Sequence, residues 1–130
     1  MAKVNRFEDL KVWQHAIEIG LKIYLLVETN SLFKDYRAKD QLVGVAISIS
    51  NNIAEGFEYN SNRQFRRYLA IAKGSAGELR SQLYLLHNAK KITSKEYELL
   101  YQELIQISSE IKGFIKYLND FEKRKEIKQG

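Results

Sequence analysis

Residues 97–121 read YELLYQELIQISSEIKGFIKYLNDF, and the spacing of their apolar side chains decides the fold. Steps of three and four residues alternate without a break, which is the 3.5-residue repeat of helical bundles and coiled coils. The repeat predicts one long helix, from about residue 93 to 123, whose apolar stripe packs against other helices. Tyr101, Ile105 and Ile115 widen the stripe, and either the other helices of the chain or a neighbouring subunit would cover them. The stripe itself consists of Tyr97, Leu100, Leu104, Ile107, Ile111, Phe114, Leu118 and Phe121.

Three further amphipathic segments precede this helix. The 130 residues contain no proline, so no proline interrupts the long predicted helices. We therefore predict an all-α fold, an antiparallel up-and-down four-helix bundle that forms a single domain over residues 1–130. The charged C-terminal tail is expected to fray. The three other helices are expected at about residues 8–28, 36–55 and 61–90.

Local signals mark where three of these helices begin or end. Gly56 follows the second helix, at the place where a left-handed C-terminal cap is expected. Ser61 with Gln64, and Thr93 with Glu96, have the spacing of capping boxes. They predict the starts of the third and fourth helices.

Composition excludes several kinds of protein. Hydrophobic residues make up 45% of the chain and charged residues 28%, as in ordinary globular proteins, and there is no cysteine. Disulfides, thiolate catalysis and cysteine-based zinc sites are therefore excluded. The N-terminal residues lack an apolar signal core, and no apolar run reaches membrane-spanning length. These features favour a cytoplasmic protein that does not enter a membrane.

The formal net charge of +5 is concentrated in residues 60–92, which hold seven basic residues and one acidic residue. Arg66, Lys73 and Arg80 are seven residues apart and fall on one arc of the third helix, with Tyr84 on the same arc. Such an arc either binds the phosphates of a nucleic acid, with Tyr84 as a ring for base stacking, or is a solvated face. The predicted nucleic-acid-binding residues are Arg63, Arg66, Arg67, Lys73, Arg80, Tyr84, Lys90 and Lys91.

Polar side chains share one face of the second helix and one of the third. Ser48, Asn52 and Glu55 are spaced by four and three residues, and Ser75 precedes Glu78 by three. Where these faces meet, their hydroxyl, amide and carboxylate groups would form a structural hydrogen-bond network. Acid/base catalysis or metal binding by the two glutamates is the alternative, but neither histidine follows a glutamate by three residues, as di-metal bundles require. We expect no catalytic residue, no metal and no cofactor.

Small residues form a row beside the basic arc: Ala70, Gly74, Gly77 and Ser81. A glycine inside a helix costs up to about 1 kcal/mol relative to alanine, so a close neighbour is expected to offset that cost. The candidates are a helix, in this chain or in another subunit, and a phosphate group.

Three ordered motifs give the sequence a family resemblance. They read FEDLKVWQHA at residues 7–16, SISNNIAEG at residues 48–56 and IAKGSAGEL at residues 71–79. Together they resemble the four-helix-bundle proteins encoded within intervening sequences of bacterial 23S ribosomal RNA genes. That family is related to the accessory variability determinant of diversity-generating retroelements. The resemblance extends over about residues 7–118.

The resemblance implies an up-and-down bundle that assembles into a barrel-like homopentamer. The retroelement relatives bind nucleic acid through basic surfaces and partner a reverse transcriptase, which implies basic helix faces displayed around a ring. We therefore expect a non-enzymatic accessory protein that acts as a homo-oligomer and binds RNA or DNA largely without sequence preference. The alternative is a homo-oligomeric scaffold or protein-interaction module whose basic face docks an acidic protein.

Overall fold

A computed structural model describes residues 3–30 and 34–129, and in these ranges the chain is helical and contains no strand. None of the described helices combines the length and apolarity that a membrane crossing needs. The elements are the short 3-10 helix η1 (Phe7–Asp9) and the α-helices α1 (Lys11–Thr29), α2 (Tyr36–Glu58), α3 (Asn62–Asn88) and α4 (Ser94–Gln129).

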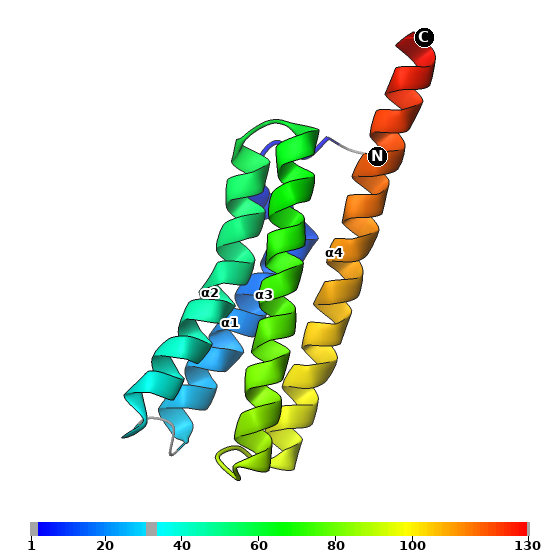
Figure 1. The fold of residues 1–130 in the computed structure, drawn as a ribbon. Coiled ribbons are helices and arrows are strands. Elements are labelled where there is room, and N and C mark those ends of the chain that lie inside the picture. Colours follow the sequence, from blue (N-terminus) through cyan, green and yellow to red (C-terminus); the bar gives the residue numbers. More distant parts are fainter. Residues whose placement is uncertain (1–2, 31–33, 130) are drawn as a thin grey trace.

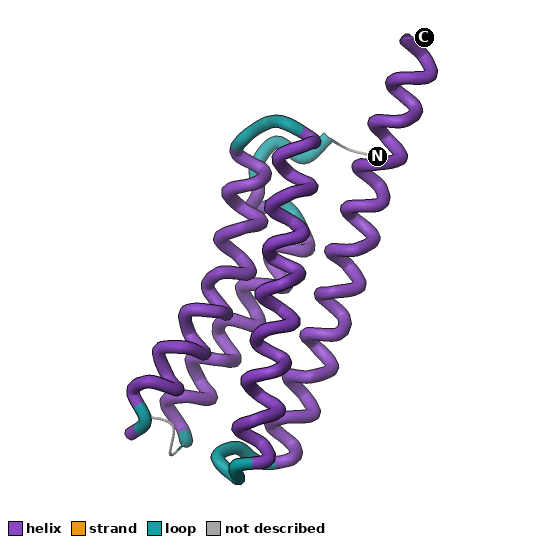
Figure 2. Tube along the Cα trace, in the orientation of Figure 1, coloured by secondary structure: helices purple, strands orange, loops and turns teal. Residues whose placement is uncertain are grey.

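Successive helices run in opposite directions and form an up-and-down bundle (Figure 1). Contacts follow the cycle α1–α2, α2–α3, α3–α4 and α4–α1, so each helix lies beside two others. The α2–α3 and α3–α4 connections are short and lie at opposite ends of the bundle (Figure 2). At 36 residues α4 is the longest helix, and its C-terminal turns extend past the rest of the bundle (Figure 1). The predicted four-helix, all-α fold is confirmed.

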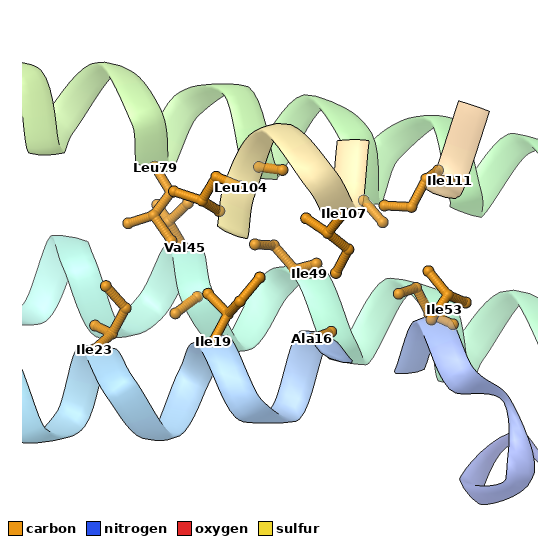
Figure 3. Packing of buried hydrophobic residues seen from close by; sticks show 14 of the residues in the cluster. Ala16, Ile19, Ile23, Val45, Ile49, Ile53, Leu79, Leu104, Ile107 and Ile111 are labelled. Carbon is orange, nitrogen blue, oxygen red and sulfur yellow. The ribbon is translucent and has the colours of Figure 1, made fainter. Parts of the chain in front are cut away.

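One apolar stripe from each helix builds the core (Figure 3). Ile19 on α1, Ile49 on α2, Leu79 on α3 and Ile107 on α4 are all fully buried. Burial of each such side chain contributes about 1.5–3 kcal/mol relative to exposure, so these contacts hold the bundle together. Five members of the stripe predicted on α4 are buried, namely Leu100, Leu104, Ile107, Ile111 and Leu118.

The rest of the α4 stripe is only partly covered. Tyr97 and Phe114 are half-buried against the core, whereas Phe121, toward the projecting end, is 48% exposed. Of the residues that widen the stripe, Tyr101 is half-buried and Ile105 is 38% exposed. The other helices of the chain therefore cover the wider stripe incompletely.

Side-chain caps fix the starts of three helices. The Ser61 hydroxyl accepts the backbone N–H of Gln64 (3.4 Å) at the start of α3. At the start of α4 both bonds of a capping box are present, because Thr93 donates its N–H to the Glu96 carboxylate (2.8 Å) and the Glu96 N–H donates to the Thr93 hydroxyl (3.1 Å). The cap of α2, which the sequence analysis did not predict, is the carboxylate of Asp35.

The prediction that Gly56 caps α2 is wrong. Gly56 is a buried residue within the helix, and α2 continues to Glu58. Among the described residues, positive φ occurs instead at Asn60 (53°) and Lys90 (61°), each in a turn between helices. A Cβ atom at position 56 would lie 2.6 Å from the Cβ of Tyr68 on α3. Glycine is therefore required here for the close approach of α3 and not for ending the helix.

The outer ends of the chain also differ from the predicted bounds. Residues Phe7–Asp9 form η1 and Leu10 is extended, so α1 begins at Lys11 and not at about residue 8. The tail that was expected to fray continues α4 to Gln129. Its many glutamate, lysine and arginine residues have high helix propensity, and neither glycine nor proline interrupts residues 114–129.

Candidate nucleic-acid interface

Five of the predicted binding residues are cations of α3, and we call them together the α3 cation line, although only Arg66, Lys73 and Arg80 share one arc of the helix: Arg63, Arg66, Arg67, Lys73 and Arg80. Arg63, Arg67 and Lys73 are exposed, and Arg66 and Arg80 are half-buried. The ion pairs of the described residues include those of Arg6 with η1, of α1 with α4, and one within α4. No carboxylate of the described residues lies within 4.0 Å of a cation of the α3 cation line. The positive charges of this line therefore form no ion pair with the described residues.

Neutral groups of α4 hold two of these guanidinium groups in place. Arg66 donates through Nη1 to the side-chain oxygen of Asn119 and through Nε to the carbonyl of Asn62 (3.4 Å). The Arg80 guanidinium lies over the ring of Tyr101, 5.8 Å from its centroid, in a cation–π contact. An amide or a ring orients a guanidinium without neutralising it, so both side chains keep their full charge on this flank of α4.

The carboxylates of α4 that contact another helix or its end lie on the opposite flank, toward α1. These three carboxylates, of Glu96, Glu103 and Glu110, are spaced by seven residues, as the cations of the α3 arc are. Each contacts a side chain of α1 or of Asn30, the residue that follows α1. The acidic side of α4 is thus used within the bundle, away from α3. The contacts are Asn30 with Glu96 (2.9 Å), Lys22 with Glu103 (2.7 Å) and His15 with Glu110 (2.5 Å).

Glu96 has the clearest electrostatic consequence of this arrangement. Partial burial alone would raise its pKa, but hydrogen bonds from the Asn30 amide and from the backbone and hydroxyl of Thr93 outweigh that effect. The pKa of Glu96 is therefore lowered below its ordinary value. The carboxylate is held ionised by its cap and by its contact with the end of α1.

Four rings gather where α3 joins α4, and we call them the ring cluster: Tyr84, His87, Tyr97 and Tyr101. The His87 ring stacks parallel on that of Tyr97, with centroids 4.7 Å apart, and its Nε2 lies 3.0 Å from the Ser94 hydroxyl. The rings of Tyr84 and Tyr101 lie 6.3 Å and 5.7 Å from Tyr97. Tyr84 is 60% exposed, so the cluster presents a ring to solvent.

The ring cluster continues directly into two further cations. Lys90 and Lys91 lie in the turn that follows α3, and both are exposed. They border a surface hollow of ≈ 590 Å³ that His87 also lines. Arg80, Tyr84, His87 and these lysines therefore occupy one end of the bundle.

A second aromatic pair lies at the other end of α3. Tyr59 and Tyr68 stack with their centroids 5.3 Å apart, and the guanidinium of Arg67 lies 5.6 Å from the centre of the Tyr68 ring. The Tyr68 hydroxyl donates to the Tyr59 hydroxyl (3.4 Å), and this bond, followed by desolvation and the charge of Glu55, raises the pKa of Tyr68. The pair could not be predicted from the sequence, because two tyrosines on either side of a turn carry no signal of their own.

The structure brings together part of the predicted polar network between α2 and α3. The hydroxyls of Ser48 and Ser75 are 2.9 Å apart, and the Asn52 amide donates to the carbonyl (2.7 Å) and hydroxyl (3.0 Å) of Ser48. Glu55 and Glu78 are exposed and have no hydrogen bond to this cluster. Across the described residues, no three histidine, cysteine or acidic side chains are grouped as metal ligands would be. The hydroxyl and amide groups meet, and the two carboxylates lie outside.

The two glycines in the row of small residues on α3 have no close neighbour on another described helix. A Cβ atom built at Gly74 or at Gly77 would meet no other group within 4 Å, and Ala70 and Ser81 are exposed. Of the candidates left open by the sequence, a described helix of this chain does not meet either glycine, and another subunit and a phosphate group remain. The neighbouring helices pack instead on the buried stripe of α3, which includes Ala72, Ala76 and Leu79.

Comparison with known proteins places this bundle in a family. Residues 8–113 match the family of 23S rRNA-intervening sequence proteins. The chain belongs to this family. A crystal structure of an S23 ribosomal protein family member of unknown function from Bacteroides thetaiotaomicron has a similar fold, with a TM-score of 0.74 and 26% sequence identity. The similarity covers 81% of this chain and 95% of the Bacteroides protein. No curated protein matches the sequence.

Proposed function

We propose that this 23S rRNA-intervening sequence protein is a non-enzymatic nucleic-acid-binding protein that acts as a homo-oligomer. The α3 cation line would contact the phosphates of RNA or DNA, with little dependence on base sequence. One observation carries the proposal: no carboxylate of the described chain pairs with these cations, while α4 directs Glu103 and Glu110 toward α1. Charge that the bundle does not use internally is available to an external polyanion.

The mechanism would be electrostatic. Residues 66 and 80 lie about 21 Å apart along the helix axis, a length over which several phosphates of one strand fit. Each phosphate neutralised by lysine or arginine releases condensed counterions, so binding weakens steeply as salt is added. Contacts of this kind position a protein on the backbone and carry no sequence information.

Self-association is the second part of the proposal. Leu21 and Leu25 on α1 and Leu99 on α4 are each at least 60% exposed, and the latter two line an apolar hollow of ≈ 260 Å³ between the helices. Exposed apolar surface of this kind favours burial against another protein. A subunit would also fill the open row of small residues on α3. The family resemblance supports a pentamer, and the mass of the protein in solution tests it.

A scaffold function is the alternative, since unpaired cations attract acidic proteins as well as nucleic acids. The reverse transcriptase that partners the retroelement relatives is a candidate partner by analogy alone. Binding assays with nucleic acid and with an acidic polypeptide such as polyglutamate separate the two functions. Binding of polyglutamate without binding of RNA or DNA would replace the main proposal with the scaffold.

The main proposal is tested with a charge-reversal variant in which Arg66, Lys73 and Arg80 are all changed to Glu. We expect the affinity for fluorescently labelled RNA and DNA, measured by anisotropy near physiological salt, to fall by about 100-fold or more. The wild-type affinity should fall linearly with the logarithm of salt concentration, and the slope should be much smaller in the variant.

A matched control makes the same change in net charge elsewhere. Lys11, Lys34 and Arg37 are exposed and lie outside α3. Changing all three to Glu should weaken binding far less, because none of the three belongs to the α3 cation line. An equal loss in both triple variants would show that net charge, and not the α3 cation line, governs binding. Circular dichroism confirms that each variant remains helical.

A further inference from the structure

Phosphate binding alone does not require the ring cluster. Cations alone neutralise phosphates, yet this end of the bundle also holds four rings in mutual contact. Three of them are half-buried between α3 and α4, whereas Tyr84 is 60% exposed. An exposed tyrosine supported from behind by another ring presents an ordered aromatic surface to solvent.

The cations around the ring cluster precede and follow its two α3 members, Tyr84 and His87, along the chain. Arg80 precedes Tyr84 by one helical turn and rests on the Tyr101 ring, 5.8 Å from its centroid. Lys90 and Lys91 follow in the turn after α3 and are exposed. A strand whose phosphates follow these cations would carry its bases past the ring of Tyr84.

We infer that the ring cluster binds unpaired nucleobases, so that the protein prefers single-stranded nucleic acid to duplex. Proteins that bind single strands combine a basic track for the backbone with aromatic side chains on which bases stack. In a duplex the base faces are covered by neighbouring bases, and an exposed tyrosine on a helix surface does not reach them. The inference rests on the proposed nucleic-acid-binding function and adds to it the form of nucleic acid that is bound.

The test compares single strands and duplexes of the same length and sequence, as RNA and as DNA, at one salt concentration. We expect the single strands to bind more tightly. Changing Tyr84 to Leu keeps an apolar side chain but removes the aromatic face, and it should weaken single-strand binding by about 5-fold to 150-fold per stacked base. Duplex affinity and the salt dependence should not change. The Tyr84→Phe variant should bind single strands as the wild type does.

Tyr36→Leu is the matched control, because Tyr36 is 69% exposed, lies at the start of α2 and is not part of the ring cluster. It should leave both affinities unchanged. An oligonucleotide that lacks bases provides a second control, and the wild type and Tyr84→Leu should bind it equally. The masses of both variants in solution show whether either change disturbs self-association.

The outcomes separate the two ideas. Salt-dependent binding that Tyr84→Leu does not alter, or alters equally for single strands and duplexes, would overturn the inference and leave the proposed function standing. Loss of self-association in Tyr84→Leu would instead make this ring a subunit contact and also overturn it. Absence of binding to every nucleic acid by the wild type would reject the proposed function and the inference together. A difference between RNA and DNA would show which single strand the ring cluster selects.

Discussion

Charges spaced by seven residues lie along both flanks of α4, carboxylates of α4 itself toward α1 and cations of α3 on the other side, but only the α1 flank is balanced. Toward α1, Lys22 and His15 lie within 4.0 Å of the carboxylates of Glu103 and Glu110. Toward α3, the guanidinium of Arg66 meets an amide oxygen, and that of Arg80 meets a ring. Spacing along a helix decides which neighbour a side chain faces, and the chemistry of that neighbour decides whether any charge remains for a third molecule.

This difference concerns the availability of charge more than the stability of the fold. Exposed ion pairs contribute about 0–1 kcal/mol each, so the α1 flank adds only modestly to a bundle held by its apolar core. On the α3 flank, hydrogen bonding and cation–π contact orient the side chains without cancelling them. The balanced flank therefore fits an internal contact and the unbalanced flank an external one.

The variant with the largest expected effect removes an ion pair from the balanced flank of α4, the one toward α1. Glu103→Lys places an ammonium group where Lys22 Nζ now lies 2.7 Å from a carboxylate, with His15 also nearby. We expect a loss of about 1–2 kcal/mol in the free energy of unfolding, because like charges replace an ion pair in which the Glu103 side chain is only 24% exposed. Urea unfolding at neutral pH measures it.

The charge-swapped double variant, Lys22→Glu with Glu103→Lys, is the control for that prediction. It restores an opposite-charge pair, so it should recover more than half of the lost stability. If the double variant is as unstable as the single one, packing of the Glu103 side chain and not its charge stabilises this flank.

Much of the fold follows from short-range patterns. The apolar repeat of residues 97–121 predicts the longest helix, and Thr93 with Glu96 predicts its start, because each signal lies within one or two turns. The role of Gly56 could not be predicted in this way. A glycine near a helix end resembles a cap, and only the position of Tyr68, twelve residues further on in another helix, shows that close packing requires it.

The candidate site shows the same limit. Helical spacing places Arg66, Lys73 and Arg80 on one arc, but it does not show that Asn119 and Tyr101 are the α4 groups beside two of them. The ring cluster likewise joins residues from two separate patterns, the basic arc of α3 and the apolar stripe of α4. Their meeting depends on the register of two antiparallel helices, which the conformation of the short connecting turn fixes and the sequence alone does not reveal.

A variant with a smaller expected effect adds one carboxylate to the unbalanced flank of α4, the one toward α3. Asn119→Asp is nearly isosteric and places a negative charge against the Arg66 guanidinium. If the α3 cation line binds phosphates, pairing one of its members should weaken binding about fivefold and reduce the slope of log affinity against log salt by about 1. Thermal stability should stay the same or rise slightly, since the new pair is favourable.

The control for that substitution uses an asparagine of the other flank. Asn30→Asp places a carboxylate beside Glu96, outside the α3 cation line but in the hollow that Lys90 and Lys91 border. It should change the salt slope less than Asn119→Asp does, because it pairs with no member of the α3 cation line, and it should lower stability slightly, because two carboxylates then face each other. Equal effects of both substitutions on binding would argue against a specific role for the α3 flank.

The smallest expected effect is a dependence of stability on pH at the end of the balanced flank. Glu96 has a lowered pKa in the folded protein, so below the ordinary glutamate value of about 4.3 the unfolded chain takes up a proton first. Its contribution is therefore complete above that value and is lost as the pH falls through the lower, folded-state pKa. Glu96→Gln keeps a side chain that can cap α4 but removes the charge, and it should cost about 0.5 kcal/mol at neutral pH. The difference in unfolding free energy between wild type and Glu96→Gln, measured with urea at a series of pH values, should shrink toward zero in acid. A difference that stays constant down to low pH would mean that the shape of the side chain, and not its ionisation, joins the start of α4 to Asn30.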